Sequence, residues 1–475
     1  MTTSPTHSYM LPSTPKFSYI DSGEDPKLLT DDDLYSEIME CGIPLLDLIA
    51  KVARGYQKGN PIALLSKAVA LAACDTPKAS ILTGIGGRPL PLNFLFCLVG
   101  PSGLGKGITL DAPMTTATPL AGYRSVTPAS GEALIAEFFE QVPAADGKGV
   151  ETQRHDDPVW ASWGEIDAFA AKSGNSNSTL DAIMRSLFSG EAAGDSSISR
   201  MKAGLGTRVE ENSYRFVMFV GAQPDHAGVL LEDATGGTLQ RLLWLPLTDD
   251  DAPEKADDIR KVRVSLESAL GMPKDSLRFK PPTLSVWGPR GTISLAPDIE
   301  DMLLENRSRL LRRLESVDPL DAHSDNLCLR LAAVFAGWRA GMTGQVVIDK
   351  EAWWWGQCIL AVSRRTRDDC KDHASRKKMH DARDAGLTDS ERFMAREAAM
   401  ETAEQRKREA LLLKMEQYLI EHRQVKRGDL SRAVTNSRNR KHFDTVAREL
   451  VHSGDVNEVR INNTTHYVYV GKHGG

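Results

Sequence analysis

Four short apolar runs punctuate the middle of the chain, and each is nearly continuous in Val, Leu, Phe, Met and Trp. They occupy residues 93–100, 158–163, 215–221 and 241–245, and the segments between them carry apolar residues at helical spacing. A continuous apolar run of this length is typical of a strand that is buried on both faces of a sheet. Strands that alternate with helices predict a parallel sheet with crossover helices. The fold class is therefore α/β, with its core over residues 77–250.

The residues on either side of this core have a mainly helical pattern. Residues 31–76 predict a helical lead-in, and residues 251–370 predict a helical extension that begins at a boundary rich in Asp, Lys and Pro. Residues 371–407 are dense in charged side chains and predict a linker helix. Residues 1–30 carry Pro, Ser and Asp without periodicity and are interpreted as a disordered arm. The tryptophan run at 353–355 is interpreted as core packing, with a base-stacking platform as the alternative.

The final segment, residues 408–475, predicts three helices followed by a hairpin. The expected helices are residues 408–422, 429–434 and 438–453, and the expected strands are residues 456–460 and 465–470. This order of elements is that of a winged helix, whose third helix enters a DNA groove. The third helix is basic, so DNA contact is predicted, and protein docking is the alternative use of such a module. Its cations are Arg438, Arg440, Lys441 and Arg448.

Charge is distributed unevenly along a chain of 475 residues whose formal net charge is -6. Residues 405–475 hold 14 Lys and Arg against 8 Asp and Glu, so the preceding residues carry the whole excess of acidic groups. A basic module on an acidic body indicates a nucleic-acid-binding arm, and a solvated charged face is the alternative.

Cysteine spacing and hydropathy indicate the cellular compartment in which the protein functions. The six cysteines are scattered without a C-x-x-C pair, which argues against a zinc-binding primase module and favours reduced thiols in the core. No run approaches the roughly 20 apolar residues of a membrane span, and the polar first residues lack a signal-peptide core. We therefore expect a cytoplasmic protein without a membrane partner.

A glycine-rich turn follows the first apolar run. The spacing of Gly100, Gly105 and Lys106 is that of a P-loop, in which backbone N–H groups and a helix N-terminus surround phosphate oxygens. Lys106 would reach the outer phosphates of ATP, and a plain strand-to-helix turn is the alternative. The predicted nucleotide-binding residues are Gly100, Pro101, Ser102, Gly103, Leu104, Gly105, Lys106, Gly107, Ile108 and Thr109.

One position of this loop departs from the usual pattern. Gly107 stands where a Ser or Thr hydroxyl ordinarily binds Mg²⁺, and Thr109 lies two places further on, on a different side of the helix. ATP with Mg²⁺ is the predicted cofactor, with phosphate binding better supported than metal binding.

Candidates for the remaining chemistry stand next to the later apolar runs. Glu165 follows the second run and would orient the attacking water, while Asp167 would hold the metal and Gly164 replaces a usual Asp. Gln223 follows the third run and would sense the γ-phosphate. Arg241 opens the fourth run and would serve as an arginine finger. Each has a structural alternative. Glu165 could be a solvated carboxylate, Gln223 could cap a turn, and Arg241 could form an ion pair.

In this order, the motifs resemble the helicase portion of primase-helicase proteins encoded by phages and mobile elements. The resemblance spans residues 43–370 and includes Val-Thr-Pro-Ala-Ser-Gly-Glu-Ala-Leu at 126–134, Gly-Ala-Gln-Pro at 221–224 and Gln-Arg-Leu-Leu-Trp-Leu-Pro at 240–246. It implies a ring, such as a hexamer, of RecA-like or AAA+-like subunits that move along DNA. By this resemblance Lys106, Glu165 and Gln223 act in their own subunit and Arg241 acts in the neighbour, and a separate protein primes synthesis.

The sequence therefore predicts an ATP-dependent helicase for phage or mobile-element replication, acting on single-stranded or forked DNA. Arg200, Lys202 and Arg208 lie in a segment that would track phosphates in a central channel, with an ordinary surface loop as the alternative. A second candidate function is a nucleotide-gated DNA-binding initiator or regulator, which Gly107 and Gly164 favour. A packaging motor is a third, although no carboxylate triad for a nuclease is evident.

Overall fold

The computed structural model describes most of the chain and divides it into two compact units, residues 1–377 and 378–475. The division falls within one helix, α13 (Lys350–His422). None of the described helices combines the length and apolar character that a bilayer span requires. The described residues are 25–76, 80–83, 89–104, 106–112, 124–143, 149–166, 169–170, 179–195, 206–228, 237–270, 292–313, 318–340, 346–436 and 439–471.

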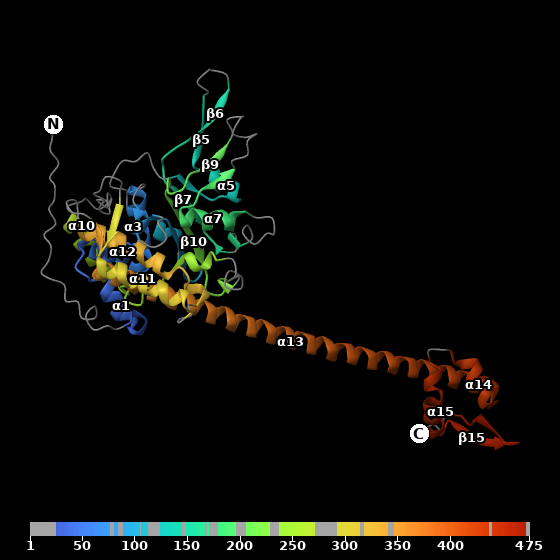
Figure 1. Ribbon diagram of the computed structural model, residues 1–475. Helices are drawn as coiled ribbons and strands as arrows, with labels where there is room; N and C mark the ends of the chain where they lie inside the picture. The colour runs from blue at the N-terminus through green and yellow to red at the C-terminus, as the bar shows by residue number, and fades with distance from the viewer. Residues whose placement is uncertain are drawn as a thin grey trace. The chain divides into compact units, whose positions relative to one another are not determined.

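A five-stranded sheet lies at the centre of the first unit (Figure 1), and every pairing in it is parallel. This confirms the predicted α/β class. The neighbouring strands β3 and β10 lie inside this sheet. Every residue of both strands is buried, as their continuous apolar runs predict. The strands, in spatial order, are β11 (Leu242–Pro246), β3 (Phe94–Val99), β10 (Phe216–Ala222), β7 (Val159–Trp163) and β4 (Arg124–Val126).

Aromatic side chains stack across three neighbouring strands of this sheet. The ring centroids of Phe96 and Phe219 lie 4.8 Å apart, and those of Trp160 and Phe219 are also 4.8 Å apart. Cross-strand aromatic pairs of this kind stabilise a given register, because slipping by one residue would turn each ring to the other face. The edge strand β4 is only three residues long and begins with Arg124, so its apolar pattern was too short to predict.

The helical lead-in consists of α1 (Asp31–Met39), α2 (Pro44–Gly55) and α3 (Pro61–Asp75). All fifteen residues of α3 are buried, and it packs against β3, β10 and β11. The predicted boundary contains a helix, α10 (Ala256–Leu270), which packs on α2. The charges that suggested a linker form ion pairs along its surface, such as Arg260 with Asp257.

A small second sheet joins distant parts of the same unit, in the order β13 (Val347–Ile348), β12 (Thr292–Leu295), β1 (Ser80–Ile81) and β2 (Leu90–Pro91). Its strands have two to four residues, too few for a periodicity signal. The extension supplies α11 (Pro297–Leu311), α12 (Ser324–Ala340) and the start of α13. The tryptophans at 353–355 are buried, as the core interpretation predicts.

All six cysteines are buried and free. Burial raises the pKa of Cys41 and of Cys74 to about 12, so these thiols stay protonated near neutral pH. They behave as core residues, in agreement with their scattered spacing.

The second unit contains the end of α13, a three-stranded antiparallel sheet and two further helices. Its elements after α13 are β14 (Gln424–Lys426), α14 (Arg427–Val434), η5 (Arg440–His442), α15 (Phe443–His452), β15 (Val456–Ile461) and β16 (Thr464–Tyr469). Asn462 and Asn463 connect β15 to β16 with φ of 47° and 62°, the left-handed conformation that a tight hairpin turn requires. The strand order is β14-β16-β15, and β14 was not predicted. Residues 371–407 and 408–422, predicted as separate helices, form one continuous helix.

Candidate functional site

Three predicted residues meet at the carboxyl edge of the central sheet. Lys106 follows β3, Glu165 follows β7 and Gln223 follows β10. The Lys106 Nζ lies 3.2 Å and 3.3 Å from the two carboxylate oxygens of Glu165, and the Gln223 Nε2 lies 3.5 Å from Glu165 Oε2. Because β10 lies between β3 and β7, the three parallel strands end side by side and deliver these side chains to one place.

Exposure differs across this group in a way that suits ligand binding. The Lys106 side chain is 10% exposed, whereas the Glu165 side chain is 51% exposed. The ammonium is therefore held in place by its surroundings, while the carboxylate faces solvent.

A glycine in β10 allows Lys106 to reach across the sheet. A Cβ atom at Gly221 of β10 would lie 2.4 Å from the Lys106 Cδ and 2.4 Å from the carbonyl oxygen of Gly164. Neither contact is tolerable, so only glycine at 221 leaves room for the lysine stem to pass from β3 to the end of β7. This role of Gly221 was not predicted, because in the sequence Gly221 is simply the last residue of an apolar run.

We expect Gly221→Ala to destabilise the protein by about 1–3 kcal/mol, the usual cost of an overpacked site. The added methyl group must displace either the backbone of Gly164 or the stem of Lys106. Denaturant unfolding measures this change. Gly164→Ala is the matched control, because a Cβ atom there meets nothing within 4 Å. Equal stability of the two variants would contradict the prediction.

One residue of the glycine-rich turn has a left-handed backbone conformation. Gly103 has φ of +89°, which favours glycine and orients backbone N–H groups differently from a regular strand or helix. A Cβ atom at Gly100 would lie 2.9 Å from the Leu247 Cβ, so this position is also closely packed. Pro101, Ser102 and Leu104 are exposed.

Side chains from the lead-in anchor the helix that follows the turn, α4 (Lys106–Leu110). The buried Thr109 donates its hydroxyl to the Lys58 carbonyl at 2.7 Å. Lys67 of α3 donates to the carbonyls of Leu110 and Ala112, and burial lowers its pKa to about 8. Lys67 was not predicted, although a single lysine within the apolar helix α3 is a usable signal.

These residues fit a phosphate group better than a metal ion. Gly103, Gly100 and Lys106 provide the backbone turn and the cation, whereas Gly107 has no hydroxyl and the Thr109 hydroxyl is already bound to Lys58. Within the described ranges no group of three or more His, Cys, Asp or Glu could hold a metal. A Mg²⁺ that arrives with a nucleotide takes most of its ligands from phosphates and water, so it needs few protein groups.

Arg241 lies at the opposite edge of the sheet from Lys106. It ends η3 (Leu239–Arg241), directly before the first residue of β11, which runs parallel to β3. The five residues of β11 therefore separate it from the carboxyl edge by about 16 Å, at roughly 3.3 Å per residue. Arg241 donates to the Gly237 carbonyl, and we find no ion pair between it and a described carboxylate. The structure thus does not bring Arg241 to the Lys106 group.

Several predicted residues lie outside the described residues, namely Gly105, Asp167, Arg200, Lys202 and Arg438. The strands β8 (Ala193–Asp195) and β9 (Thr207–Val209) pair with each other in antiparallel fashion. Arg208 on β9 forms an ion pair with Glu210 at 3.2 Å.

Of the predicted DNA-contacting residues in the second unit, Arg440, Lys441 and Arg448 are exposed. The Lys441 Nζ lies 2.9 Å from a carboxylate oxygen of Glu404 on α13, and the Arg448 Nε donates to the Asp444 carbonyl. Hydrogen bonds from Lys441, Lys407 and His442 lower the pKa of Glu404 to about 2. Glu404 therefore stays ionised near neutral pH and holds Lys441.

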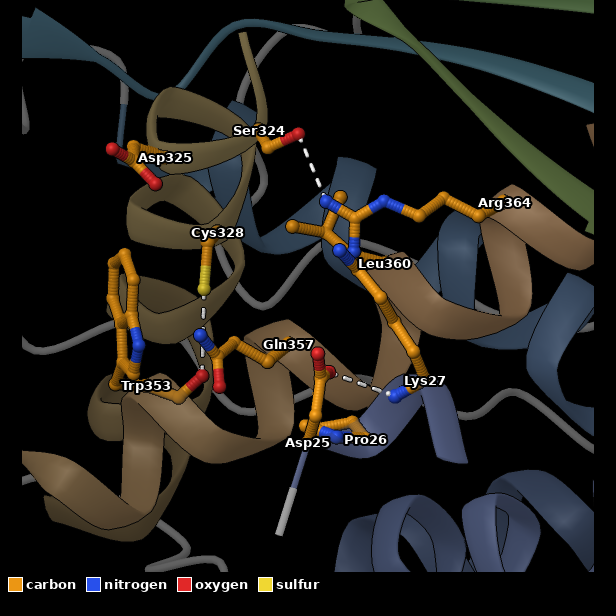
Figure 2. A pocket seen from close by; sticks show the side chains of 10 residues that line it. All are labelled: Asp25, Pro26, Lys27, Ser324, Asp325, Cys328, Trp353, Gln357, Leu360 and Arg364. Carbon is orange, nitrogen blue, oxygen red and sulfur yellow. Dashed lines mark hydrogen bonds between the residues drawn. The ribbon is translucent and has the colours of Figure 1, made fainter. Parts of the chain in front are cut away.

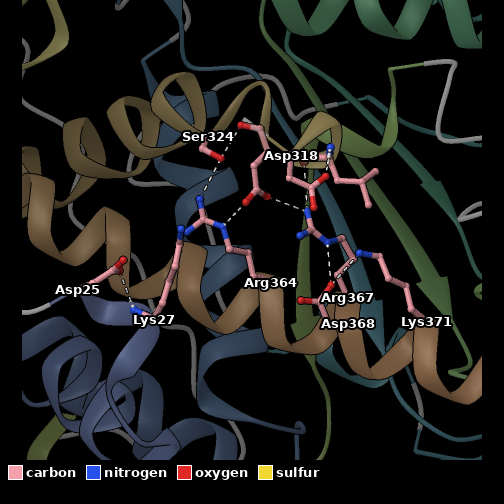
Figure 3. A network of polar contacts seen from close by, with 10 residues as sticks. Asp25, Lys27, Asp318, Ser324, Arg364, Arg367, Asp368 and Lys371 are labelled. Carbon is pink, nitrogen blue, oxygen red and sulfur yellow. Dashed lines mark hydrogen bonds and ion pairs between the residues drawn. The ribbon is translucent and has the colours of Figure 1, made fainter. Parts of the chain in front are cut away.

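A separate pocket of about 270 Å³ lies between η1 (Pro26–Leu28), α12 and the first turns of α13 (Figure 2). Arg364 lines it and donates to the Ser324 hydroxyl at 3.0 Å. Arg364 also pairs with Asp321, as does Arg367 one turn further along α13 (Figure 3). Burial raises the pKa of Asp321, but the two arginines outweigh it and lower that pKa below its ordinary value. These contacts connect η4 (Pro319–Asp321) to α13.

No model of a known protein family matches this chain, and a search of curated proteins finds no similar sequence.

Proposed function

We propose that this protein is an ATP-dependent DNA helicase or translocase that serves replication of a phage or mobile element. The observation that carries the proposal is the contact of Lys106 with Glu165 and Gln223 behind a glycine-rich turn at the carboxyl edge of a parallel sheet. In α/β sheets this edge is where ligands bind, and a lysine beside a solvent-facing carboxylate suits phosphoryl chemistry. The finer fold assignments, a P-loop ATPase core and a C-terminal winged helix, belong to this proposal.

The three side chains have complementary roles in this scheme. The Lys106 ammonium binds outer phosphate oxygens of ATP, and the turn from Gly100 to Gly107 donates backbone N–H groups. Glu165 orients the attacking water and accepts its proton, and the Gln223 amide binds the water or the terminal phosphate. A bound Mg²⁺ would neutralise charge on the phosphates.

The contact between Lys106 and Glu165 suggests an order of events. A phosphate group competes with the Glu165 carboxylate for the same ammonium, because both are anions within reach of one Nζ atom. When Lys106 turns to the phosphate, Glu165 loses its cationic partner, and both carboxylate oxygens can then accept hydrogen bonds from the attacking water. Glu165 would then act as a base only after a nucleotide is bound.

The position of Arg241 favours an oligomer. A residue at the amino edge cannot reach its own subunit's turn, but in a ring the opposite faces of neighbouring subunits meet. Arg241 would then contact the nucleotide of the next subunit, which couples hydrolysis to assembly. A homohexamer in the cytoplasm, working with a separate primase, is the assembly that we propose.

Purified protein should hydrolyse ATP in the presence of Mg²⁺, faster with forked or single-stranded DNA, and should displace a strand from a fork. ATP turnover that ignores DNA, together with no displacement, would count against a motor. Failure to bind any nucleoside triphosphate would overturn the proposal as a whole.

The second candidate, a nucleotide-gated DNA-binding regulator, is favoured by the sparse metal ligation. Gly107 and Gly164 lack metal-binding side chains, and the Thr109 hydroxyl is bound to Lys58. A regulator would protect a DNA site in footprinting and unwind nothing, so footprinting and strand displacement on the same DNA separate the two functions.

We expect Glu404→Gln to strengthen DNA binding by the second unit, because it releases Lys441 from its ion pair. One additional phosphate contact makes the slope of log affinity against log salt steeper by about 0.9. A fluorescence binding titration over a salt series measures this slope. Glu409→Gln, which removes a charge from the same helix where the carboxylate contacts Gln405, is the control. Equal slopes for both variants would show that Glu404 does not restrain a DNA-binding lysine.

A further inference from the structure

Two guanidinium groups lie beside one backbone position at the amino edge of the central sheet. A Cβ atom at Gly237 would lie 3.0 Å from Arg241 Nη1 and 4.0 Å from Arg185 Nη1. Arg185 comes from α7 (Leu180–Ser189) and Arg241 from η3. Gly237 has φ of +80°, so the turn that brings the two arginines together itself favours glycine.

Arg185 is oriented by one carboxylate. Its Nε lies 3.1 Å from Asp181 Oδ2, and the other oxygen of Asp181 accepts a hydrogen bond from the Thr238 hydroxyl. Asp181 is thus fully engaged on this side of the cluster. The Arg185 side chain is 38% exposed, so its fork remains accessible beyond the ion pair.

A third arginine adds to the positive charge behind this pair. The guanidinium of Arg330 lies 3.8 Å from the centroid of the Phe188 ring, and that of Arg241 lies 5.8 Å from the same centroid. Arg330 is fully buried and donates to the carbonyls of Pro91 and Phe188, both at 2.7 Å. Among the described residues, neither Arg241 nor Arg330 forms an ion pair, whereas Arg185 pairs with Asp181.

The neighbouring titratable groups do not balance this charge. Burial, followed by Arg241 and Arg330, lowers the pKa of His323 to about 4, so the imidazole is neutral at pH 7. Burial and then the nearby Arg185 lower the pKa of Arg241, while Asp181 and Glu191 act in the opposite direction. Like charges held this close together favour a bound anion.

We propose that Arg185 and Arg241 together form a receptor for a terminal phosphate that a second copy of this chain presents on its glycine-rich turn. The inference rests on the proposed function and adds Arg185 to it as a second catalytic arginine that acts between subunits. Two planar forks can hold the oxygens of a tetrahedral phosphate from two directions, which one fork cannot do. The pair lies one strand length from its own Lys106, so the phosphate must come from another molecule.

We expect Arg185→Ala to lower ATP turnover by about 10- to 100-fold, the equivalent of one lost charged hydrogen bond in the transition state. Binding of a fluorescent ATP analogue to the single chain should change by less than about 2-fold, because Arg185 is not near the chain's own turn. Assembly driven by a non-hydrolysable ATP analogue, followed by sedimentation, should be lost. Arg260→Ala, which removes an exposed arginine paired on α10, should change none of these quantities.

Mixing subunits tests whether Arg185 acts across the interface. Lys106→Ala chains lack a working turn but keep Arg185, whereas Arg185→Ala chains keep the turn. A mixture should hydrolyse ATP faster than either variant alone, because some sites combine an intact turn with an intact arginine pair. Absence of this rescue would place Arg185 in its own subunit's site and overturn the proposal.

Arg185→Lys covers the case in which the alanine variant fails to fold, since lysine keeps the charge beside Asp181. It should melt like the wild type and still lose at least about 10-fold in turnover, because it lacks the planar fork.

An active wild type with unchanged Arg185→Lys turnover would overturn this inference alone. A wild type without nucleotide binding would instead overturn the proposed function. Loss of DNA affinity in Arg185→Ala with turnover intact would show that the phosphate belongs to nucleic acid.

Discussion

Replacing Lys106 with Ala is expected to lower ATP turnover by about 10²- to 10³-fold, the usual loss when one preorganised group that stabilises transition-state charge is removed. Lys106 is the cation of the candidate site whose ammonium lies within 3.3 Å of both Glu165 oxygens, and its side chain is only 10% exposed. Coupled-assay turnover and binding of a fluorescent ATP analogue give the two readings.

The matched control is Lys51→Ala, which removes a surface lysine that pairs with Asp47. Turnover of this variant should equal that of the wild type, and both variants should melt within a few degrees of it. If Lys106→Ala folds, binds the analogue and turns over normally, the glycine-rich turn is only a strand-to-helix connection.

Arg241→Ala should reduce turnover by about 10³-fold or more, as removal of an arginine finger does in GTPases, if Arg241 has that role in the proposed assembly. Arg241 lies at the amino edge of the sheet, far from the glycine-rich turn of its own chain. A single subunit should therefore bind the ATP analogue as tightly without Arg241 as with it. The signature of the variant is normal affinity in the isolated chain with almost no hydrolysis in the assembly.

Arg312→Ala, at the exposed end of α11, is the control for loss of one arginine. Thermal unfolding shows whether loss of the contacts with Gly237 and Phe188 alters the fold. Weakened analogue binding by monomeric Arg241→Ala, or full turnover, would contradict a role across the interface.

Local pattern was sufficient for the strands that matter most. The runs at β3, β7, β10 and β11 are buried on both faces, so nearly every position must be apolar and the run stands out against its flanks. The three-residue strand β4 and the four short strands of the second sheet carry no such signal. The positions of β1, β4, β12 and β13 follow from pairing with residues far away in sequence.

Composition did not predict the packing of α10, because this helix has charged residues on one face and buried residues on the other. Residues 256–270 have the Asp and Lys content of a linker, yet α10 buries Leu266 and places Val262 3.3 Å from the Cβ position of Gly55. Charge density reports on the solvent side of a helix and says little about the other side.

The sequence by itself determined the glycine-rich turn, the polar residues beside the long apolar runs and the order of those runs along the chain, because these are properties of adjacent residues. Only the tertiary structure decided that Lys106 touches Glu165, 59 positions away, with Gly221 making room for it. It also decided that the Thr109 hydroxyl is bound to Lys58 and that Arg241 joins Arg185 at the opposite edge. The reason is the spatial order of the strands in the sheet. Which strand ends lie side by side depends on pairings between distant segments, and no local pattern encodes those pairings.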